Sequence, residues 1–182
     1  MKKLLFVDCC IRDNSRTKKL ASYYLNTKKD YDIKGVKLTS LNIKPLDENT
    51  IIQRDVDIKN NNFSKYEQAI DFANVDEIVI AAPYWDMSFP SLLKVYFENI
   101  CVNGITFGYD ENGKLVKKVK AKTLTYIVTS GGPLSNKSSL YSYLKELCDL
   151  FSIPTFNFYY VDMLDVYPND VCDRLIETAK KF

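Results

Sequence analysis

Short runs of apolar residues alternate with longer segments of helical periodicity along most of the chain. The clearest run, Glu77–Ala82, is apolar at every position after its first residue, which is typical of a strand buried on both faces. The periodic segments place apolar residues three or four positions apart, as in an amphipathic helix. The predicted strands are Lys3–Asp8, Ile33–Leu38, Glu77–Ala82, Thr123–Thr129 and Phe156–Val161. The predicted helices are Ser15–Asn26, Ser64–Asn74, Pro90–Ile100, Ser138–Phe151 and a last one that begins at Pro168.

This alternation predicts an α/β fold in which a parallel sheet is covered by helices on both faces, a three-layer sandwich. Right-handed crossovers make such a sheet doubly wound, and five strands favour the flavodoxin-like order 2-1-3-4-5 over the six-stranded dinucleotide-binding fold. The polar segment 45–62 is predicted to be an irregular connection. The turn Asn112-Gly113, between Ile105–Tyr109 and Leu115–Val119, predicts a β-hairpin excursion before the fourth strand.

Composition and charge narrow the class of protein. The 182 residues suit a single domain, 1–182, with a sizeable core. The net charge of +2 supports neither a nucleic-acid-binding protein nor a strongly acidic electron carrier. The apolar run Leu4–Val7 is too short for a secretory signal, and no stretch approaches the length of a membrane span. We therefore expect a soluble, cytoplasmic protein.

The five cysteines and the absence of histidine limit the chemistry further. No two cysteines stand in a C-x-x-C pair, so no zinc, iron–sulfur or other metal site is expected, and free thiols are the default. Without histidine, a serine or cysteine nucleophile has no imidazole base.

Three loops that leave the predicted strands have unusual compositions: Cys9–Thr17, Pro83–Pro90 and Ser130–Asn136. In a sheet of this kind, ligands bind beyond the carboxyl ends of the strands, where these loops converge. In the first loop, Ser15 and Thr17 offer hydroxyl groups to a phosphate at a helix N-terminus, and Arg16 or Arg12 offers a positive charge. The alternative is that Ser15 only caps the helix. The chain has no Walker lysine motif and no G-x-G-x-x-G, so ATP and a dinucleotide fingerprint are disfavoured.

The second loop is rich in large apolar side chains, and the third contains two glycines. Tyr84, Trp85, Met87 and Phe89 need a partner, which is the core, another subunit or a flat ligand. The alternative is a hydrophobic plug beneath the loop. The glycine pair in the third loop allows a backbone to approach a ligand closely, or forms a plain turn.

The stretch from Ala81 to Gly113 resembles the signature AAPMYNF…LKxYFD…GxTFxYTExG of the FMN-dependent NADH:azoreductases and related NAD(P)H:quinone reductases, which have a flavodoxin-like fold. The resemblance extends from Leu4 to about Phe158. Its matching segments are Ala81-Ala82-Pro83-Tyr84-Trp85-Asp86, then Leu92, Lys94, Tyr96 and Phe97, then Gly104-Ile105-Thr106-Phe107-Gly108-Tyr109-Asp110-Glu111-Asn112-Gly113.

The resemblance implies an FMN site and a place for each of its residues. It implies phosphate binding by Ser15, Arg16 and Thr17, with Cys10 nearby. It implies contacts with the flavin ring from Pro83, Tyr84, Trp85, Asp86 and Met87, and contacts with its far edge from Ser130, Gly131 and Gly132. Tyr84, Trp85 and Tyr109 are expected to form walls of the substrate pocket, although Tyr109 has an alternative role in packing the hairpin. One departure is that Gly131 stands where the family has a basic residue.

The expected function is that of an oxidoreductase in which FMN performs the hydride chemistry, so no catalytic side chain is named. NADH or NADPH is the expected co-substrate, and the acceptor is a flat compound such as a quinone or an azo compound. The resemblance also implies a ping-pong mechanism and a homodimer with active sites at the subunit boundary. The alternative is a flavodoxin-type electron-transfer protein without its own NAD(P)H activity.

Overall fold

The computed structural model describes residues 1–135 and 138–182, so Asn136, the last residue of the third loop, lies outside the described part. Five strands alternate with helices along these residues. The strands are β1 Lys2–Asp8, β2 Tyr31–Lys37, β3 Glu77–Ala81, β4 Thr123–Thr129 and β5 Thr155–Val161. The α-helices are α1 Arg16–Asn26, α2 Glu48–Lys59, α3 Glu67–Ala73, α4 Ser91–Ile100, α5 Ser139–Leu150 and α6 Val171–Ala179, and the short 3₁₀ turns are Leu38–Ser40 and Pro168–Asp170.

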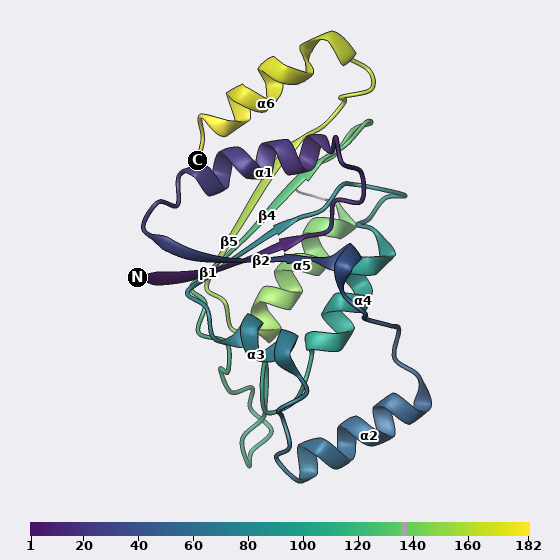
Figure 1. Cartoon of the computed structure of the whole chain (residues 1–182), viewed down its shortest axis with the longest axis vertical. Coiled ribbons are helices and arrows are strands. Elements are labelled where there is room, and N and C mark those ends of the chain that lie inside the picture. The colour runs from purple at the N-terminus through teal and green to yellow at the C-terminus, as the bar shows by residue number, and fades with distance from the viewer. Residues whose placement is uncertain (136–137) are drawn as a thin grey trace.

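The strands form one parallel sheet in the order β2-β1-β3-β4-β5, which confirms the prediction. Figure 1 shows α1 and α6 on one face of the sheet and α3, α4 and α5 on the other. The chain order reverses between β1 and β3, which places the expected ligand site at the carboxyl ends of these two strands.

The hydrophobic core lies in two layers, one on each face of the sheet. All five residues of β3 are buried, which explains why its sequence after Glu77 is apolar without alternation. One layer packs α3, α4 and α5 against the sheet around Phe72 and Phe97, and the other packs α1 and α6 around Leu20 and Leu175. The sheet is thus packed on both faces, and this packing positions the loops at its carboxyl edge.

The segment 45–62 is not an irregular connection, because it contains the helix α2. Asp47 caps this helix by accepting a hydrogen bond from the Thr50 N–H at 2.8 Å. The apolar residues of α2 do not form a continuous buried face, since Ile52 and Val56 are exposed. The sequence therefore lacks the periodic pattern that indicates a helix of the core. Polar and apolar contacts together hold α2: its buried Asp57 accepts a hydrogen bond from the Tyr66 hydroxyl at 2.8 Å, and Ile58 packs against the main core. Figure 1 shows α2 at the end of the molecule, away from the sheet.

The predicted hairpin is a tight turn without flanking strands. Tyr109 and Leu115 form a single antiparallel bridge, and Gly113 has a positive φ of 74° in the turn. The flanking residues Ile105 and Val119 are buried in the main core, so they pack there and do not pair with each other. The Asn112-Gly113 signal therefore identified the turn correctly but overestimated the pairing.

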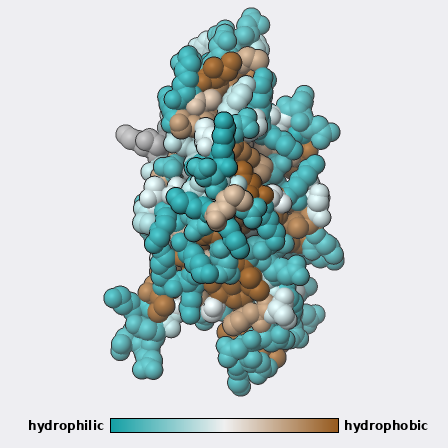
Figure 2. Space-filling model, turned by 60° about the vertical axis from the view of Figure 1, so that its left-hand side comes forward, coloured by the Kyte–Doolittle hydropathy of each residue, from teal (hydrophilic) through white to brown (hydrophobic). Residues whose placement is uncertain are grey.

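The surface is mostly polar. Figure 2 shows hydrophilic residues over most of one face, with hydrophobic residues in separate groups between them. Among the described residues, no helix is both long enough and apolar enough to span a bilayer. The same residues contain no group of three or more Cys, Asp or Glu side chains placed to hold a metal ion.

Candidate functional site

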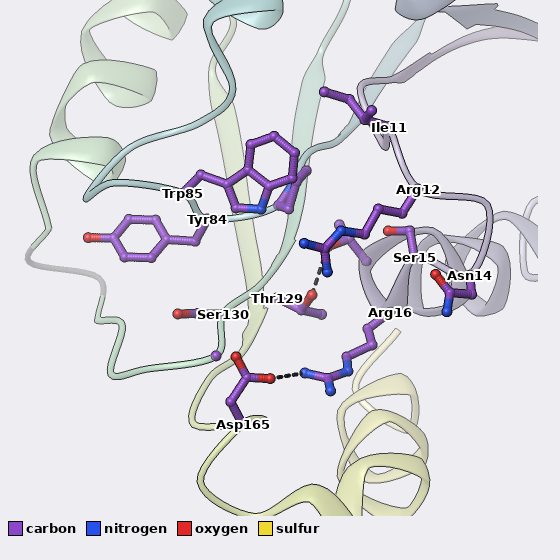
Figure 3. A pocket seen from close by; sticks show the side chains of 13 residues that line it. Ile11, Arg12, Asn14, Ser15, Arg16, Tyr84, Trp85, Thr129, Ser130 and Asp165 are labelled. Atoms are coloured by element: carbon purple, nitrogen blue, oxygen red, sulfur yellow. Dashed lines mark hydrogen bonds and ion pairs between the residues drawn. The ribbon is translucent and has the colours of Figure 1, made fainter.

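Loops at the carboxyl edge of the sheet enclose a cavity of about 400 Å³. This volume lies in the range of ~300–1,000 Å³ that is usual for small-molecule sites. Three of the loops are those that the sequence analysis identified, and a fourth, after β5, adds one acidic residue. Figure 3 shows the first turn of α1 facing Tyr84 and Trp85 across the cavity. The lining residues are Ile11, Arg12, Asn14, Ser15, Arg16, Thr17, Pro83, Tyr84, Trp85, Thr129, Ser130, Gly131 and Asp165.

The amino end of α1 forms the polar side of this cavity. Ser15 caps the helix, since its hydroxyl oxygen accepts a hydrogen bond from the Lys18 N–H at 3.2 Å. The N–H groups of Arg16 and Thr17 have no acceptor among the described residues, as is usual in the first turn of a helix. Free N–H groups at the positive end of a helix dipole bind anions. In the cap the Ser15 hydroxyl only accepts, so it can donate its proton either to the neighbouring Cys10 sulfur or to a ligand, and the two roles considered for Ser15 are compatible.

Asp8, at the end of β1, anchors the loop that leads into α1. Its buried carboxylate accepts a hydrogen bond from the Cys10 N–H at 2.9 Å and forms an ion pair with Lys18 at 3.1 Å. The hydrogen bond and the charge of Asp8 raise the pKa of Lys18. These contacts join the strand, the loop and the first turn of α1, and so hold the free N–H groups in place at the cavity.

A pair of buried hydroxyls joins the first turn of α1 to the end of β4. The Oγ1 atoms of Thr17 and Thr129 lie 2.7 Å apart. Each hydroxyl has one proton, and their mutual hydrogen bond uses only one of the two protons. The remaining proton is available to an acceptor in the cavity that both residues line. The donors on this side are therefore backbone N–H groups, hydroxyls and guanidinium groups, which is the donor set that suits a phosphate.

The loop after β3 forms the flat, apolar side of the cavity. Trp85 and Ser88 exchange two backbone hydrogen bonds of 2.9 and 2.8 Å, which close a two-residue turn. The central residues of this turn, Asp86 and Met87, have positive φ angles of 49° and 65°. A type I′ turn needs this conformation, and glycine or asparagine usually provides it. The turn presents Trp85, which is partly exposed, to the cavity.

Met87→Gly is expected to raise the free energy of unfolding by about 0.5–1 kcal/mol. A left-handed residue other than glycine costs ~1–2 kcal/mol, and part of the gain is offset by the greater freedom of glycine in the unfolded chain. Met87 is 70% exposed in the single chain, so little packing within the chain is lost, and the comparison is made at a protein concentration at which the chain is monomeric. Urea denaturation of both proteins measures the difference. Asp86→Gly is the matched control and should gain less, because aspartate tolerates this conformation better. A loss of stability in Met87→Gly would contradict the assignment of strain.

A second cavity of about 670 Å³ adjoins the first. It shares Arg12, Tyr84, Trp85, Ser130, Gly131 and Asp165 with the first cavity and adds Asp86, Met87, Gly132 and Pro133. Of the predicted cofactor residues, eight line the first cavity and three line only the second. The eight are Ser15, Arg16, Thr17, Pro83, Tyr84, Trp85, Ser130 and Gly131, and the three are Asp86, Met87 and Gly132.

Cys10 lies beneath the cavity and does not line it. Its side chain is buried, and its Sγ lies 3.6 Å from the Ala81 carbonyl oxygen. Burial raises the pKa of Cys10 to about 12, and it also raises the pKa of Cys9 to about 12. Both side chains are therefore neutral thiols at pH 7. The structure gives the Cys10 side chain no direct access to a ligand in this cavity.

Tyr109 also lies outside both cavities. It is 58% exposed, and its ring packs edge-on against Phe107 with 6.1 Å between ring centroids. This contact corresponds to the alternative role in which Tyr109 packs against the turn. The site that one chain forms by itself has Tyr84 and Trp85 as its aromatic walls.

The sequence analysis missed Asp165, which follows β5. Its carboxylate forms an ion pair with Arg16 at 2.6 Å, and Figure 3 shows the two side chains pointing toward one another. A fourth strand-end loop was the available signal, because β5 also ends at the carboxyl edge of the sheet. Asp165 was not predicted as a site residue because an acidic side chain does not fit the donor set of a phosphate site.

Comparisons with known proteins identify the fold and the family of the chain. The family model of the flavodoxin-like fold matches residues 2–182. FMN-dependent NADH:quinone oxidoreductase 2 of Clostridium acetobutylicum is 33% identical over 195 residues, covering 100% of this chain and 96% of that protein. The FMN-dependent NADH:quinone oxidoreductase of Coprothermobacter proteolyticus is 31% identical over 196 residues, with the same coverage of 100% and 96%.

Solved structures support the fold. The crystal structure of an FMN-dependent NADH-azoreductase from Bacillus anthracis in complex with FMN superposes with a TM-score of 0.80 at 20% identity, covering 100% of this chain and 97% of that one. The resemblance found in the sequence is confirmed by the family match and by the two relatives. The chain therefore belongs to the flavodoxin-like family of the FMN-dependent NADH:quinone oxidoreductases.

Proposed function

We propose that this protein binds FMN and transfers two electrons from NADH or NADPH to a flat acceptor, such as a quinone or an azo compound, in a ping-pong sequence. The observation that carries the proposal is one cavity with free N–H groups and hydroxyls on its α1 side, which suit a phosphate, and with Tyr84 and Trp85 on its aromatic side. Such a cavity suits a ligand that is flat at one end and phosphorylated at the other. The relatives from Clostridium and Coprothermobacter carry FMN and a quinone in their names.

The residues present fit FMN. The free N–H groups of α1, the Ser15 hydroxyl and the proton of the Thr17–Thr129 pair would hold its phosphate. Tyr84 and Trp85 would lie against the flavin ring and exclude water from it. FMN itself supplies the hydride and electron chemistry when bound, and the protein binds, orients and tunes it.

The adjoining second cavity is the proposed place for the nicotinamide and then the acceptor. Met87, Trp85 and Pro133 make its lining partly apolar, as a flat aromatic substrate requires. A ping-pong sequence needs the two substrates to use this place in turn, which is compatible with a single cavity beside the cofactor.

The purified protein tests the proposal directly. It should be yellow, release FMN rather than FAD on denaturation, and oxidise NADH or NADPH steadily when a quinone is added. A protein that holds FMN without oxidising either nucleotide would be an electron carrier of the flavodoxin type. A colourless protein that cannot be reconstituted with FMN would contradict both functions.

The protein is expected to be a homodimer, with the loop 84–89 or the helix α4 near the interface. The exposed apolar side chain of Met87 on this loop, together with the family membership, supports this expectation. Met87→Lys should shift the sedimentation equilibrium toward the monomer, because it places a charge in the contact. Ile176→Lys, an exposed apolar residue on α6, is the matched control and should leave the dimer intact. A wild-type monomer that is fully active would contradict the expected dimer.

We also propose that the protein works in the cytoplasm. All five cysteines are free thiols, and three of them, Cys9, Cys10 and Cys148, are buried. Free cysteines are typical of proteins in a reducing compartment. Fractionation of cells followed by immunodetection would test this location.

A further inference from the structure

Asp165 is an acidic residue at a site whose other polar groups suit an anion. It lines both cavities, and its side chain is 71% exposed, so it is not a buried structural ion. Its Oδ1 lies 2.6 Å from Nη1 of Arg16, on the first turn of α1. Its Oδ2 lies only 2.0 Å from the position that a Cβ atom would take on Gly131. The carboxylate therefore fills the space that the absent side chain of Gly131 leaves beside the cavity.

The backbone of Asp165 is fixed while its side chain is free to turn. Its N–H donates to the Gly131 carbonyl oxygen at 3.1 Å, and the Leu164 N–H donates to the Ser130 carbonyl oxygen at 3.1 Å. The contact of the carboxylate with Arg16 is the only polar contact of this side chain among the described residues. A change of side-chain rotamer is thus enough to release both Arg16 and the space over Gly131.

The ion pair and a bound phosphate make competing demands on Arg16. A phosphate on the free N–H groups of α1 shares a cavity with the Asp165 carboxylate, and the two negative charges repel each other. The negative charge of the phosphate also attracts the guanidinium of Arg16. A guanidinium donates the same planar N–H groups to a phosphate as to a carboxylate. A flavin without a phosphate makes no such demand on Arg16.

We propose that Asp165 lowers the affinity for FMN by competing with its phosphate for Arg16, and that it thereby narrows the difference in affinity between FMN and riboflavin. This inference rests on the proposed function, because it takes FMN as the ligand of the cavity. In the free protein the Asp165 carboxylate occupies Arg16 as an internal anion. When FMN binds, Arg16 is transferred to the phosphate and the carboxylate turns toward solvent.

The test is Asp165→Asn in the full chain, with dissociation constants for FMN and riboflavin measured by flavin fluorescence on dilution of the loaded protein. The variant should bind FMN about 10-fold more tightly, which corresponds to about 1.4 kcal/mol. Its affinity for riboflavin should change less than twofold. In an Arg16→Gln background, Asp165→Asn should tighten FMN binding less than threefold, because the shared guanidinium is gone.

Asp170→Asn is the matched control, since it removes the same charge from the same C-terminal segment at a residue that lines neither cavity. It should leave both affinities within twofold. Unchanged or weaker FMN binding in Asp165→Asn would overturn the inference, and so would an equal gain for riboflavin or an equal gain in the control. If the wild-type protein binds no FMN at all, the proposed function fails instead, so the two failures are distinguishable.

Discussion

Ser15→Gly is expected to weaken FMN binding by about 10- to 100-fold while the free energy of unfolding changes by only a few tenths of a kcal/mol. A hydrogen bond to a charged group contributes ~1.5–3 kcal/mol, and each ~1.4 kcal/mol is tenfold in affinity. Glycine is almost as good a helix cap as serine, whereas alanine costs ~1 kcal/mol. The glycine variant therefore removes the hydroxyl proton offered to the phosphate and retains most of the capping.

Titration with FMN and urea denaturation of the same variant separate the two roles of Ser15. Ser138→Gly is the matched control, because Ser138 caps α5 in the same way, accepting from the Tyr141 N–H at 3.2 Å, and lines neither cavity. It should leave FMN affinity unchanged. If Ser15→Gly binds FMN as tightly as the wild type, Ser15 is only a helix cap and the phosphate site must lie elsewhere.

Glu77→Gln is expected to lower the free energy of unfolding by about 3 kcal/mol and Tm by roughly 6–12 °C. Glu77 is buried at the start of β3, where it pairs with Lys28 at 2.8 Å and accepts a hydrogen bond from the Tyr24 hydroxyl at 2.8 Å. Glutamine keeps the shape but leaves the partly buried charge of Lys28 without its counterion. Breaking a buried pair from one side is costly, because the remaining charge stays desolvated.

The double variant Glu77→Gln with Lys28→Met is the control for this prediction. It removes both charges and should recover most of the lost stability, and thermal unfolding of the three variants measures the coupling. The affinity for FMN should be unchanged below Tm, because Glu77 lies at the opposite end of β3 from the cavity. Additive losses in the double variant would show that the pair contributes packing rather than charge.

The sheet and the location of the site could be predicted from the sequence because both depend on local patterns. The apolar run at Glu77–Ala82 and the polar cap at Ser15 correspond closely to β3 and to the start of α1. The helix α2 could not be predicted in this way, because contacts between distant residues, such as the hydrogen bond from Arg54 to the Glu98 carbonyl oxygen at 3.0 Å, hold it in place. The strand pairing on either side of the turn at Asn112-Gly113 was overestimated for a similar reason. The residues that flank the turn are buried in the core, and this burial overrides pairing between them.

Within the site, sequence patterns identified residues that follow a strand directly, and they missed the contact between loops. Arg16 was expected to hold a phosphate, and the sequence offers no sign that Asp165, 149 positions away, pairs with it. The hydroxyl pair of Thr17 and Thr129 is equally non-local, since it joins the first turn of α1 to the end of β4. The aromatic residues Tyr84 and Trp85 were found because large apolar side chains on a loop are uncommon whatever surrounds them.

The hydrogen bonds that join the loops after β4 and β5 determine where the entropic cost of ligand binding falls. The loop 130–132 is already ordered by residues 163–165 through bonds from the N–H groups of Met163, Leu164 and Asp165. In residues 11–14, by contrast, the Arg12 carbonyl oxygen accepts one hydrogen bond from the Ser15 N–H at 3.2 Å, and none of the four N–H groups has an acceptor among the described residues. Ordering a free residue costs ~1–2 kcal/mol of backbone entropy. The side of the cavity at β4 and β5 is therefore preorganised, and the loss of chain freedom on binding is concentrated in the four residues that precede Ser15.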